Sequence, residues 1–375
     1  MTGSGPLTER VCQAVLAAGI DAVGVAPAEP FDSTRRDLIE RRASGLHGGM
    51  QFTYRNPERS TDPGRVVPGA VSLVVGALWY LRAEDPTPGG MVAPARVARY
   101  AREDFYGQLR DALDGGASVL RKAGYHAVVV ADSNALVDRE AAKRAGLGWY
   151  GRNANLLLPG RGSWFVLGAV VTDAALTPSA PVEPACGSCT RCLTACPTDA
   201  IVAPGVVDAR RCLAWLVQAP GVIPREFRVA LGDRIYGCDD CQEVCPPNIA
   251  VQRRSPPVAG EQATPAVDAV TFLDDDDDTV LAAAGRWYVQ GRDARYLRRN
   301  ALVVLGNVGD PRDPRVVQAV SAGLEHADPL VRAHAVWAAA RLGLSELVEP
   351  LRSTEADAMV IDEVRAMTDV VARPR

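Results

Sequence analysis

The sequence has no long uninterrupted apolar run. The longest, from Ala70 to Leu81, is too short to span a bilayer and is typical of a buried strand. The N-terminal residues also lack the basic region, apolar run and small-residue cleavage site that together mark a secretory signal. The sequence therefore predicts a soluble, cytoplasmic protein with no membrane partner.

Two nucleotide-binding fingerprints and an excess of basic residues are absent as well. No G-x-G-x-x-G opens a helix after a strand-like run, and no G-x-x-x-x-G-K-[ST] loop occurs, which excludes the folds that these motifs identify. With 41 Lys and Arg against 45 Asp and Glu, the formal net charge is −4. Any contact with nucleic acid must therefore depend on a local basic patch.

What the sequence does have is the composition of a globular protein, with 47% hydrophobic and 23% charged residues. Its 375 residues exceed one typical core and predict two or three domains. Strand-like runs at 21–26, 70–80, 125–132 and 163–173 alternate with helical patterns at 6–20, 105–124 and 135–146. This alternation predicts an N-terminal α/β domain.

Eight of the nine cysteines are clustered between residues 186 and 245. Disulfides are rare in the cytoplasm, so the clustering indicates metal. The first segment, C-x2-C-x2-C-x3-C-P from Cys186 to Pro197, has the spacing of bacterial two-cluster ferredoxins. Structural zinc sites usually pair two C-x2-C hooks across a spacer. The spacing therefore favours two 4Fe–4S clusters, with zinc as the alternative.

The crossing pattern of such ferredoxins gives a ligand hypothesis. In that pattern the first three cysteines hold one cluster and the fourth, followed by proline, holds the other. The second segment, C-x2-C-x3-C-P, has only three cysteines, so Cys212 is expected to supply the missing ligand. Cluster one is assigned Cys186, Cys189, Cys192 and Cys245, and cluster two is assigned Cys238, Cys241, Cys212 and Cys196.

The C-terminal part carries a weak repeat. An apolar pattern that begins at Asn300 returns at His334, 34 residues later, which suits stacked helical pairs of the HEAT type. The expected division is an α/β catalytic domain at 1–176, a ferredoxin-like domain at 177–255 and a HEAT-like helical domain at 256–375. Together these make an α+β multidomain protein. Because clusters carry electrons and perform no bond chemistry, the reaction is expected in the α/β domain.

Several segments resemble the epoxyqueuosine reductase family, whose members complete the formation of queuosine in tRNA. The resemblance covers most of residues 20–250, and the tail is similar to the HEAT-like extension of the longer members. It is carried by RNPERSTDPGRVVPGA from Arg55, VARYAREDFY from Val97, ADSNALVDREAAKRAGLGWYGRN from Ala131, GSWFVLGAVVTD from Gly162 and RIYGCDDCQ from Arg234, together with the cysteine motifs.

The resemblance implies a cobalamin cofactor held between the N-terminal domain and the clusters, in a module similar to that of reductive dehalogenases. It also implies that no histidine binds cobalt from below. The D-x-H-x-x-G loop that supplies such a ligand elsewhere is missing, since none of His47, His126, His326 and His334 follows an aspartate by two positions.

The family's proton donor falls at Asp132, at the end of a predicted strand. A strand-end acid in an α/β domain is expected to face a crevice, and partial desolvation should raise its pKa. The alternative is that Asp132 caps the following helix. The same resemblance implies cofactor contacts for Arg55, Asn153, Ser163, Asp239 and Asp240. Asp138 is assigned a structural role.

Four positions depart from the family pattern. Asn134 and Ala135 replace the usual Gly-Pro, Arg152 replaces a lysine, and Pro247 replaces a tryptophan. These changes affect individual cofactor contacts, while Asp132 and the eight cysteines are retained.

The implied reaction is reduction of the epoxide of epoxyqueuosine at the tRNA wobble position. Electrons come from a ferredoxin or flavodoxin through the clusters to cobalamin, and Asp132 protonates the departing oxygen. The protein is expected to be a monomer. A basic segment with interleaved aromatics is the expected tRNA contact; the alternative is an ordinary solvated face with core aromatics. It comprises Arg286, Arg292, Arg295, Arg298 and Arg299 with Trp287, Tyr288 and Tyr296.

Two other functions remain open from the sequence. One is a reductive dehalogenase-like enzyme that acts on a small molecule. The other is an electron-transfer module that binds no cobalamin.

Overall fold

The computed structural model describes residues 4–82, 89–254 and 264–371. The chain forms two compact units, each assembled from separate segments. The first unit comprises 1–83, 103–212 and 239–260, and the second comprises 84–102, 213–238 and 261–375. The three-domain division expected from the sequence stays a prediction, and its boundary at 255/256 lies outside the described residues.

The centre of the first unit is a four-stranded sheet. Its order is β1 (Ala22–Pro27), β2 (Ser72–Trp79), β7 (Phe165–Thr172) and β4 (Ala127–Ala131). The two central strands are apolar on both faces and almost entirely buried. These four strands and the helices α1 (Ser4–Ala17), α4 (Phe105–Lys122) and α5 (Asp138–Arg144) confirm the elements that the hydrophobic pattern predicts.

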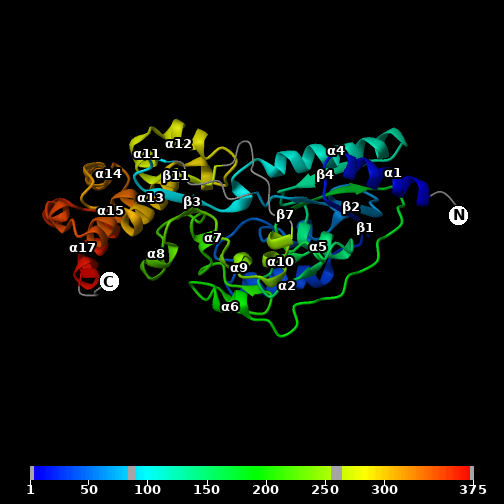
Figure 1. Ribbon diagram of the computed structural model, residues 1–375, viewed down its shortest axis with the longest axis horizontal. Helices are drawn as coiled ribbons and strands as arrows, with labels where there is room; N and C mark the ends of the chain where they lie inside the picture. Colours follow the sequence, from blue (N-terminus) through cyan, green and yellow to red (C-terminus); the bar gives the residue numbers. More distant parts are fainter. Residues whose placement is uncertain (1–3, 83–88, 255–263, 372–375) are drawn as a thin grey trace. The chain divides into compact units, whose positions relative to one another are not determined.

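Alternate residues of β2 face different helices. Leu73, Val75 and Ala77 share a core with α5, whereas Gly76 faces α4, where a Cβ would lie 3.0 Å from Leu113 Cδ2. The helices α1 and α4 pack together on one face, and α5 lies on the other (Figure 1). This sandwich of helices explains why the strands read as continuous apolar runs.

Every neighbouring pair in this sheet is antiparallel. The expectation that Asp132 faces a crevice relied on the rule for parallel sheets, in which the carboxyl ends of the strands share one edge. That rule does not apply to an antiparallel sheet. The position of Asp132 is instead explained by the loop that follows β4.

The remaining elements of the first unit are short. The cysteine motifs lie on or beside α6 (Arg191–Thr194), α9 (Asp240–Glu243) and α10 (Pro246–Arg254). The others are α2 (Asp32–Ala43), α3 (Pro57–Ser60), the hairpin β5 (Trp149–Tyr150) and β6 (Leu156–Leu157), and the hairpin β8 (Ile201–Ala203) and β9 (Val206–Val207).

The second unit combines a small sheet with stacked helices. The strand β3 (Pro94–Val97) pairs in parallel with β10 (Arg234–Tyr236) and antiparallel with β11 (Ala266–Asp268). The helices are α7 (Leu213–Leu216), α8 (Arg225–Leu231), α11 (Ala269–Asp274), α12 (Asp277–Ala283), α13 (Arg295–Val308), α14 (Pro314–Leu324), α15 (Pro329–Leu342), α16 (Leu351–Thr354) and α17 (Ala358–Val371).

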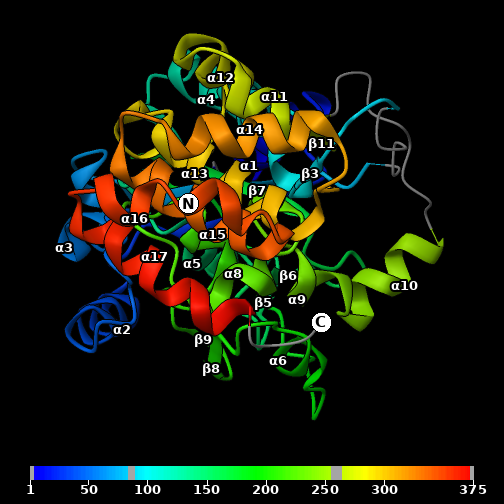
Figure 2. The ribbon, with the colours of Figure 1, turned by 90° about the vertical axis from the view of Figure 1, so that its left-hand side faces the viewer.

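The helices α13, α15 and α17 pack in succession, and Figure 2 shows α14, α15 and α17 laid one after another. Gly306 of α13 allows close approach, because a Cβ there would lie 2.7 Å from Trp337 Cζ3 of α15. Both α14 and α15 begin with Asp-Pro, in which Asp313 or Asp328 caps the helix. The repeat seen in the sequence, from Asn300 to His334, relates α13 to α15, two helices that pack against each other. None of the described helices is both long and apolar enough to cross a bilayer.

Candidate functional site

Asp132 follows the last residue of β4 and has a left-handed backbone, with φ of 49°. This conformation is uncommon for a residue with a side chain and is frequent at functional sites. The helix α5 begins only at Asp138, after Val137. Asp132 therefore does not cap that helix, and the alternative reading of this residue is wrong.

Contacts with the segment 53–60 fix the loop that carries Asp132. The side-chain oxygen of Asn134 accepts a hydrogen bond from the Thr53 N–H at 3.3 Å. At the end of the loop, the Val137 N–H donates to the Ser60 carbonyl at 2.9 Å. The Ser60 hydroxyl in turn donates to the Thr53 carbonyl at 3.0 Å. The loop is thus held at two points by one neighbouring segment.

The side chain of Asp132 remains accessible, yet protein atoms around the carboxyl exclude enough water to raise its pKa. Arg110 of α4 opposes this rise. Burial also raises the pKa of Asp138; Arg139 counteracts that rise, and the negative charge of Asp132 adds to it. Because burial disfavours its charged form, Asp132 retains its proton at a higher pH than an ordinary aspartate. This is the property that a general acid requires.

Two tyrosines with raised pKa values were not expected from the sequence. Burial raises the pKa of Tyr150, and Asp138 and Glu140 raise it further. Burial and then Asp239 raise the pKa of Tyr80. Arg139 acts on both phenols in the opposite direction. Both tyrosines follow tryptophans at strand ends. This pattern is equally typical of core aromatics, so no specific sequence signal distinguishes them.

Asn153 and Ser163 are buried and have protein partners. Asn153 Nδ2 donates to the carbonyl of Cys241 at 3.1 Å. The Ser163 hydroxyl donates to Gln242 Oε1 at 2.9 Å, and Asn248 Nδ2 donates to the Ser163 oxygen at 2.9 Å. These contacts dock the second cysteine motif onto the loops of the first unit. Cofactor contact by either residue stays a prediction.

The other expected cofactor contacts differ in exposure. Arg55 is exposed, and its guanidinium has no hydrogen bond or ion pair to a described residue. Asp239 is buried at the start of α9, where its carboxylate accepts a bond from Gln242 Nε2 at 3.4 Å, and Asp240 is the first residue of that helix. Arg55 has the free donors that a corrin amide or a phosphate requires. The buried Asp239 shapes the loop between two cysteines.

The structure brings the first cysteine motif close to Cys245. Burial and the neighbouring thiols of Cys186, Cys192 and Cys189 raise the pKa of Cys245 to about 11. These four residues are the set assigned to cluster one. Thiols from two separated segments of the chain therefore meet, which is the arrangement that a crossing double-cluster fold requires.

The cysteines assigned to cluster two come from segments of both units. Cys196, Cys212 and Cys241 belong to the first unit, whereas Cys238 is the last residue of a second-unit segment. Cys196 Sγ accepts a bond from the Ala200 N–H at 3.2 Å. Within the described residues, no three His, Cys, Asp or Glu side chains are grouped as a single metal ion requires. A four-iron cluster binds each thiolate at a separate iron.

The family comparisons match both the cysteine region and the helical tail. Residues 185–248 match a 4Fe-4S double cluster binding domain, and residues 286–367 match HEAT repeats. The epoxyqueuosine reductase of Vibrio cholerae is 33% identical, with 88% of this chain and 91% of that protein covered. The enzyme of Xanthomonas campestris is 35% identical, with 80% and 87% covered. The chain belongs to the epoxyqueuosine reductase family.

A solved structure of an epoxyqueuosine reductase supports this assignment. It contains a tRNA-Tyr epoxyqueuosine-modified stem loop and superposes with a TM-score of 0.88 at 27% identity, covering 98% of this chain and 99% of that one. The expected fold class is thereby confirmed, as are the double-cluster domain and the HEAT repeats. As a member of the epoxyqueuosine reductase family, the chain is an oxidoreductase.

Three residues of the basic segment expected to bind tRNA, Trp287, Arg298 and Arg299, are buried within the second unit, so that expectation is wrong for them. Arg299 is fully buried and donates to the carbonyls of Leu216, Val217, Ala219 and Gly221. Arg298 is 6% exposed and pairs with Asp277 at 2.8 Å. The ring of Trp287 is buried in a stack with Tyr236.

The other three arginines of this segment also have protein partners. Arg286 donates to the carbonyls of Ala101 and Arg102, and Arg292 donates to three backbone carbonyls. Arg295 forms ion pairs with Asp293 and Asp328. These three arginines and Tyr288 are nevertheless exposed, so a tRNA contact by them stays a prediction.

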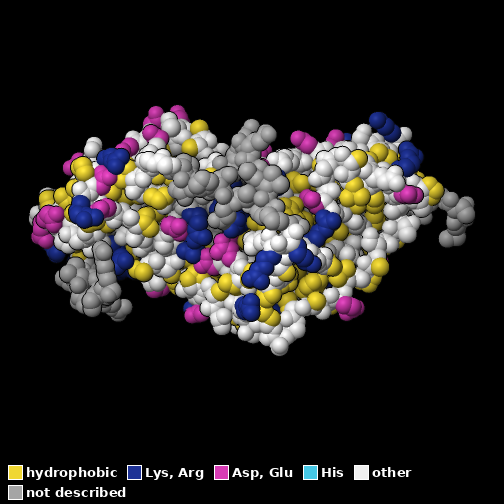
Figure 3. Space-filling model, viewed as in Figure 1, with side chains coloured by type: hydrophobic (Ala, Val, Ile, Leu, Met, Phe, Trp, Pro, Cys, Tyr) yellow, Lys and Arg dark blue, Asp and Glu magenta, His cyan; other side chains and the backbone are white. Residues whose placement is uncertain are grey.

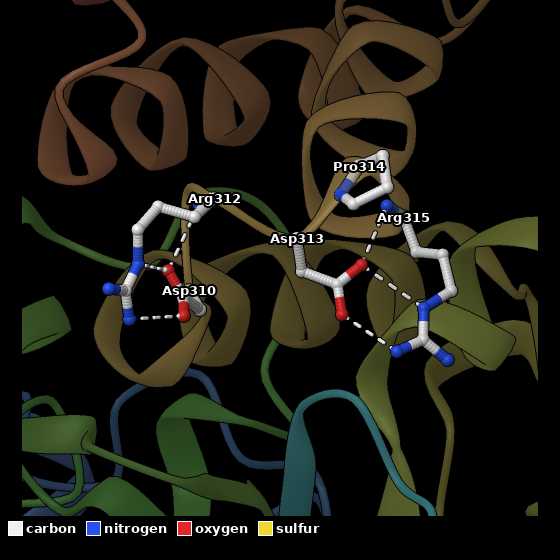
Figure 4. A pocket seen from close by; sticks show the side chains of 5 residues that line it. All are labelled: Asp310, Arg312, Asp313, Pro314 and Arg315. Carbon is white, nitrogen blue, oxygen red and sulfur yellow. Dashed lines mark hydrogen bonds and ion pairs between the residues drawn. The ribbon is translucent and has the colours of Figure 1, made fainter.

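A surface hollow lies where α13 leads into α14 (Figure 4). It is lined by Asp310, Arg312, Asp313, Pro314 and Arg315. Each arginine folds back onto the aspartate two residues before it, with paired N–O distances of 3.0 and 2.8 Å for Arg312 and 3.1 and 2.7 Å for Arg315. Because these charges neutralise one another, the hollow is a helix start rather than an anion site.

Three of the four histidines have protein partners. His126 pairs with Asp173, His326 accepts the Asp328 N–H, and His334 is buried with two backbone partners. The pKa of Asp173 is lowered, chiefly by its hydrogen bond from His126. The remaining residue, His47, has a buried Nδ1 without a partner among the described residues. The absence of a lower histidine ligand to cobalt stays a prediction.

Proposed function

We propose that this protein reduces the epoxide of epoxyqueuosine in the tRNA anticodon to the alkene of queuosine. The observation that carries the proposal is the position of Asp132, an accessible acid with a raised pKa, in the same unit as seven of the eight clustered cysteines. Membership of the family supports the reaction, and the position of Asp132 supports its role as the acid. The overall change consumes two electrons and two protons and releases one water.

The eight cysteines are proposed as the ligands of two 4Fe–4S clusters, in the pairing given by the sequence. For cluster one, the support is the meeting of Cys245 with the first motif. For cluster two, the support is the spacing of Cys238 and Cys241 and the N–H donated to Cys196. Thiolates are the usual protein ligands of such clusters.

Cobalamin is proposed as the group next to the substrate, and when bound it supplies low-potential electrons to the epoxide carbon. Arg55 is proposed to bind a corrin amide or the nucleotide phosphate through its free guanidinium. The other proposed cofactor contacts are Asn153, Ser163, Asp239 and Asp240. Asp132 donates a proton to the epoxide oxygen as the carbon–oxygen bond breaks, and solvent supplies the second proton.

The partners are proposed to be tRNA and a small acidic electron carrier such as a ferredoxin or flavodoxin. Figure 3 shows Lys and Arg side chains gathered over α6, α9 and α10, with hydrophobic side chains between them. Arg191 on α6 and Arg253 on α10 are both exposed. Exposed cations beside cluster ligands suit an acidic carrier, because opposite charges speed encounter. A cytoplasmic, monomeric protein is the form proposed.

The deciding experiment is an anaerobic assay of the reconstituted protein. The full chain, loaded with iron, sulfide and cobalamin, is reduced chemically and mixed with tRNA that carries epoxyqueuosine. We expect digested tRNA to contain a nucleoside lighter by one oxygen. Protein without added cobalamin and an Asp132→Asn variant are the matched controls. Fully loaded protein that leaves the epoxide intact would overturn the proposal, and turnover without cobalamin would overturn the cofactor assignment.

A further inference from the structure

Two side-chain amides of one loop surround Cys241. Asn153 Nδ2 donates to the Cys241 carbonyl at 3.1 Å, and Asn155 Nδ2 lies 4.0 Å from Cys241 Sγ. Asn155 is partly buried and belongs to the turn between β5 and β6. One amide therefore fixes the backbone of the cysteine while the other approaches its sulfur.

Hydrogen bonds within the loop hold the backbone of Asn155 in place. The Gly151 N–H donates to the Asn155 carbonyl at 2.8 Å, and the Asn155 N–H donates to Asn153 Oδ1 at 3.2 Å. Ala154, between Asn153 and Asn155, has a left-handed backbone with φ of 62°. Its carbonyl accepts a hydrogen bond from Arg139 Nη1 at 3.2 Å. A Cβ at Gly151 would lie 2.8 Å from Asn153 Oδ1, so the turn needs glycine there.

We propose that Asn155 is a positioning residue that raises the reduction potential of the cluster bound through Cys241. Its amide N–H points at a thiolate that gains negative charge when the cluster accepts an electron. A donor in that place stabilises the reduced cluster more than the oxidised one. The inference rests on the proposed function, because it takes Cys241 to be a cluster ligand.

A second sulfur of the same cluster also accepts a hydrogen bond. Cys196, assigned with Cys241 to cluster two, accepts the Ala200 N–H at 3.2 Å. The backbone donor is fixed by the turn and cannot be removed by a side-chain change. Asn155 is a side-chain donor through which this potential is adjustable by sequence, and cluster two is the cluster affected.

The test uses three variants of the cluster-loaded full chain. Asn155→Leu keeps a similar volume without a donor, Asn155→Asp keeps the shape with a negative charge, and Asn155→Ser keeps a smaller donor. Gln13→Leu is the control, because Gln13 is an amide on α1 bonded only to Glu9 among the described residues. Iron and sulfide content are measured first, and the two clusters are then titrated anaerobically by electron paramagnetic resonance.

We expect every variant to contain full iron and sulfide. In the Asn155 variants, the midpoint reduction potential of one cluster should be more negative. For Asn155→Leu, a tenfold loss in the one-electron equilibrium constant corresponds to about 59 mV. Asn155→Asp should shift the midpoint further, and Asn155→Ser less. The other cluster and Gln13→Leu should titrate as the parent protein does.

Fully loaded Leu and Asp variants that titrate at the parent potentials would overturn the inference. Loss of iron from all three Asn155 variants would also overturn it, because the residue would then support folding rather than potential. A parent protein that binds no iron and sulfide contradicts the proposed function instead. The two failures are therefore distinguishable.

Discussion

Asn134 accepts a hydrogen bond from the backbone N–H of Thr53. Thr53 and Asp132, which lies in the same loop as Asn134, both have unusual backbone conformations. Thr53 is left-handed, with φ of 36°, as is Asp132, with φ of 49°. The distance between Thr53 N and Asn134 Oδ1 is 3.3 Å. Strained backbone persists only where its surroundings hold it. We therefore interpret this contact as part of what keeps the proton donor in position.

Replacing Asn134 by alanine should loosen that loop. Losing one partly exposed hydrogen bond of about 1 kcal/mol lowers kcat about fivefold, whereas the KM for tRNA should change little. Steady-state kinetics over a range of tRNA concentrations measures kcat and KM separately. Hydrogen exchange of the Thr53 amide should become faster. Gln13→Ala is the matched control. An unchanged kcat together with unchanged exchange contradicts a positioning role for Asn134.

Replacing Asp132 by asparagine removes the acid and retains the shape. Loss of a general acid costs about 10²–10⁴-fold in rate. In the parent enzyme the acid must be protonated, so kcat should fall as pH rises through the raised pKa of Asp132. The pH profile of single-turnover rates measures this alkaline limb, that is, the fall in rate as pH rises. Cobalamin and cluster spectra serve as the control, since they should match the parent protein. A variant that turns over at the parent rate removes the acid role.

Arg110→Gln should move that limb. The Arg110 guanidinium lowers the pKa of Asp132 against the effect of burial, so removing its charge raises that pKa. The alkaline fall of kcat should then begin at higher pH, while the rate at acidic pH stays close to that of the parent. The same pH profile checks this. A limb that stays in place would mean that another group controls it.

The sequence predicted the acid through a motif that resembles the family's, and it predicted the thiols through their spacing. Asp132 follows a strand of five residues, Ala127–Ala131, and the cysteine spacing is specific enough to imply crossing ligands. Strand direction was not available, because a buried central strand reads as apolar whether its neighbours are parallel or antiparallel. The antiparallel sheet therefore emerged only from the structure.

Contacts between distant segments were also beyond the sequence. Nothing local distinguishes a solvated arginine from Arg299, whose donors reach carbonyls about eighty positions earlier in the chain. The Asn155 amide likewise meets Cys241 only through the turn after β5. In the sequence, polar side chains of this kind cannot be told from surface residues, because their partners are distant along the chain.

Arg299→Ala should destabilise the second unit without a specific effect on tRNA binding. Burial lowers the pKa of Arg299 to about 9, and removing the side chain leaves several buried carbonyls without donors. Each unsatisfied group costs about 1–3 kcal/mol, so a loss of at least about 3 kcal/mol is expected. Urea unfolding followed by tryptophan fluorescence measures it. Arg312→Ala, at an exposed pair, is the control and should change stability by less than about 1 kcal/mol.

His334 should make the second unit less stable in mild acid. It is fully buried, with Nε2 accepting the Ile223 N–H at 3.2 Å and Nδ1 donating to the Leu330 carbonyl at 2.8 Å. Burial, and then Arg228 and Arg299, hold its pKa well below the ordinary value. As pH falls below about 6.5, the unfolded chain binds a proton that the folded chain refuses. Folding stability then declines by about 1.4 kcal/mol per pH unit.

Hydrogen exchange of the α15 amides, corrected for the intrinsic pH dependence of exchange, measures this decline between pH 7.5 and 5. His334→Gln keeps a polar side chain that does not titrate, so its protection should be lower at neutral pH but should vary less with pH. His126→Gln is the comparison, because His126 is exposed and its ring pairs with Asp173. If the parent protein and His334→Gln lost protection equally over this range, the buried imidazole would not be the group that responds to acid.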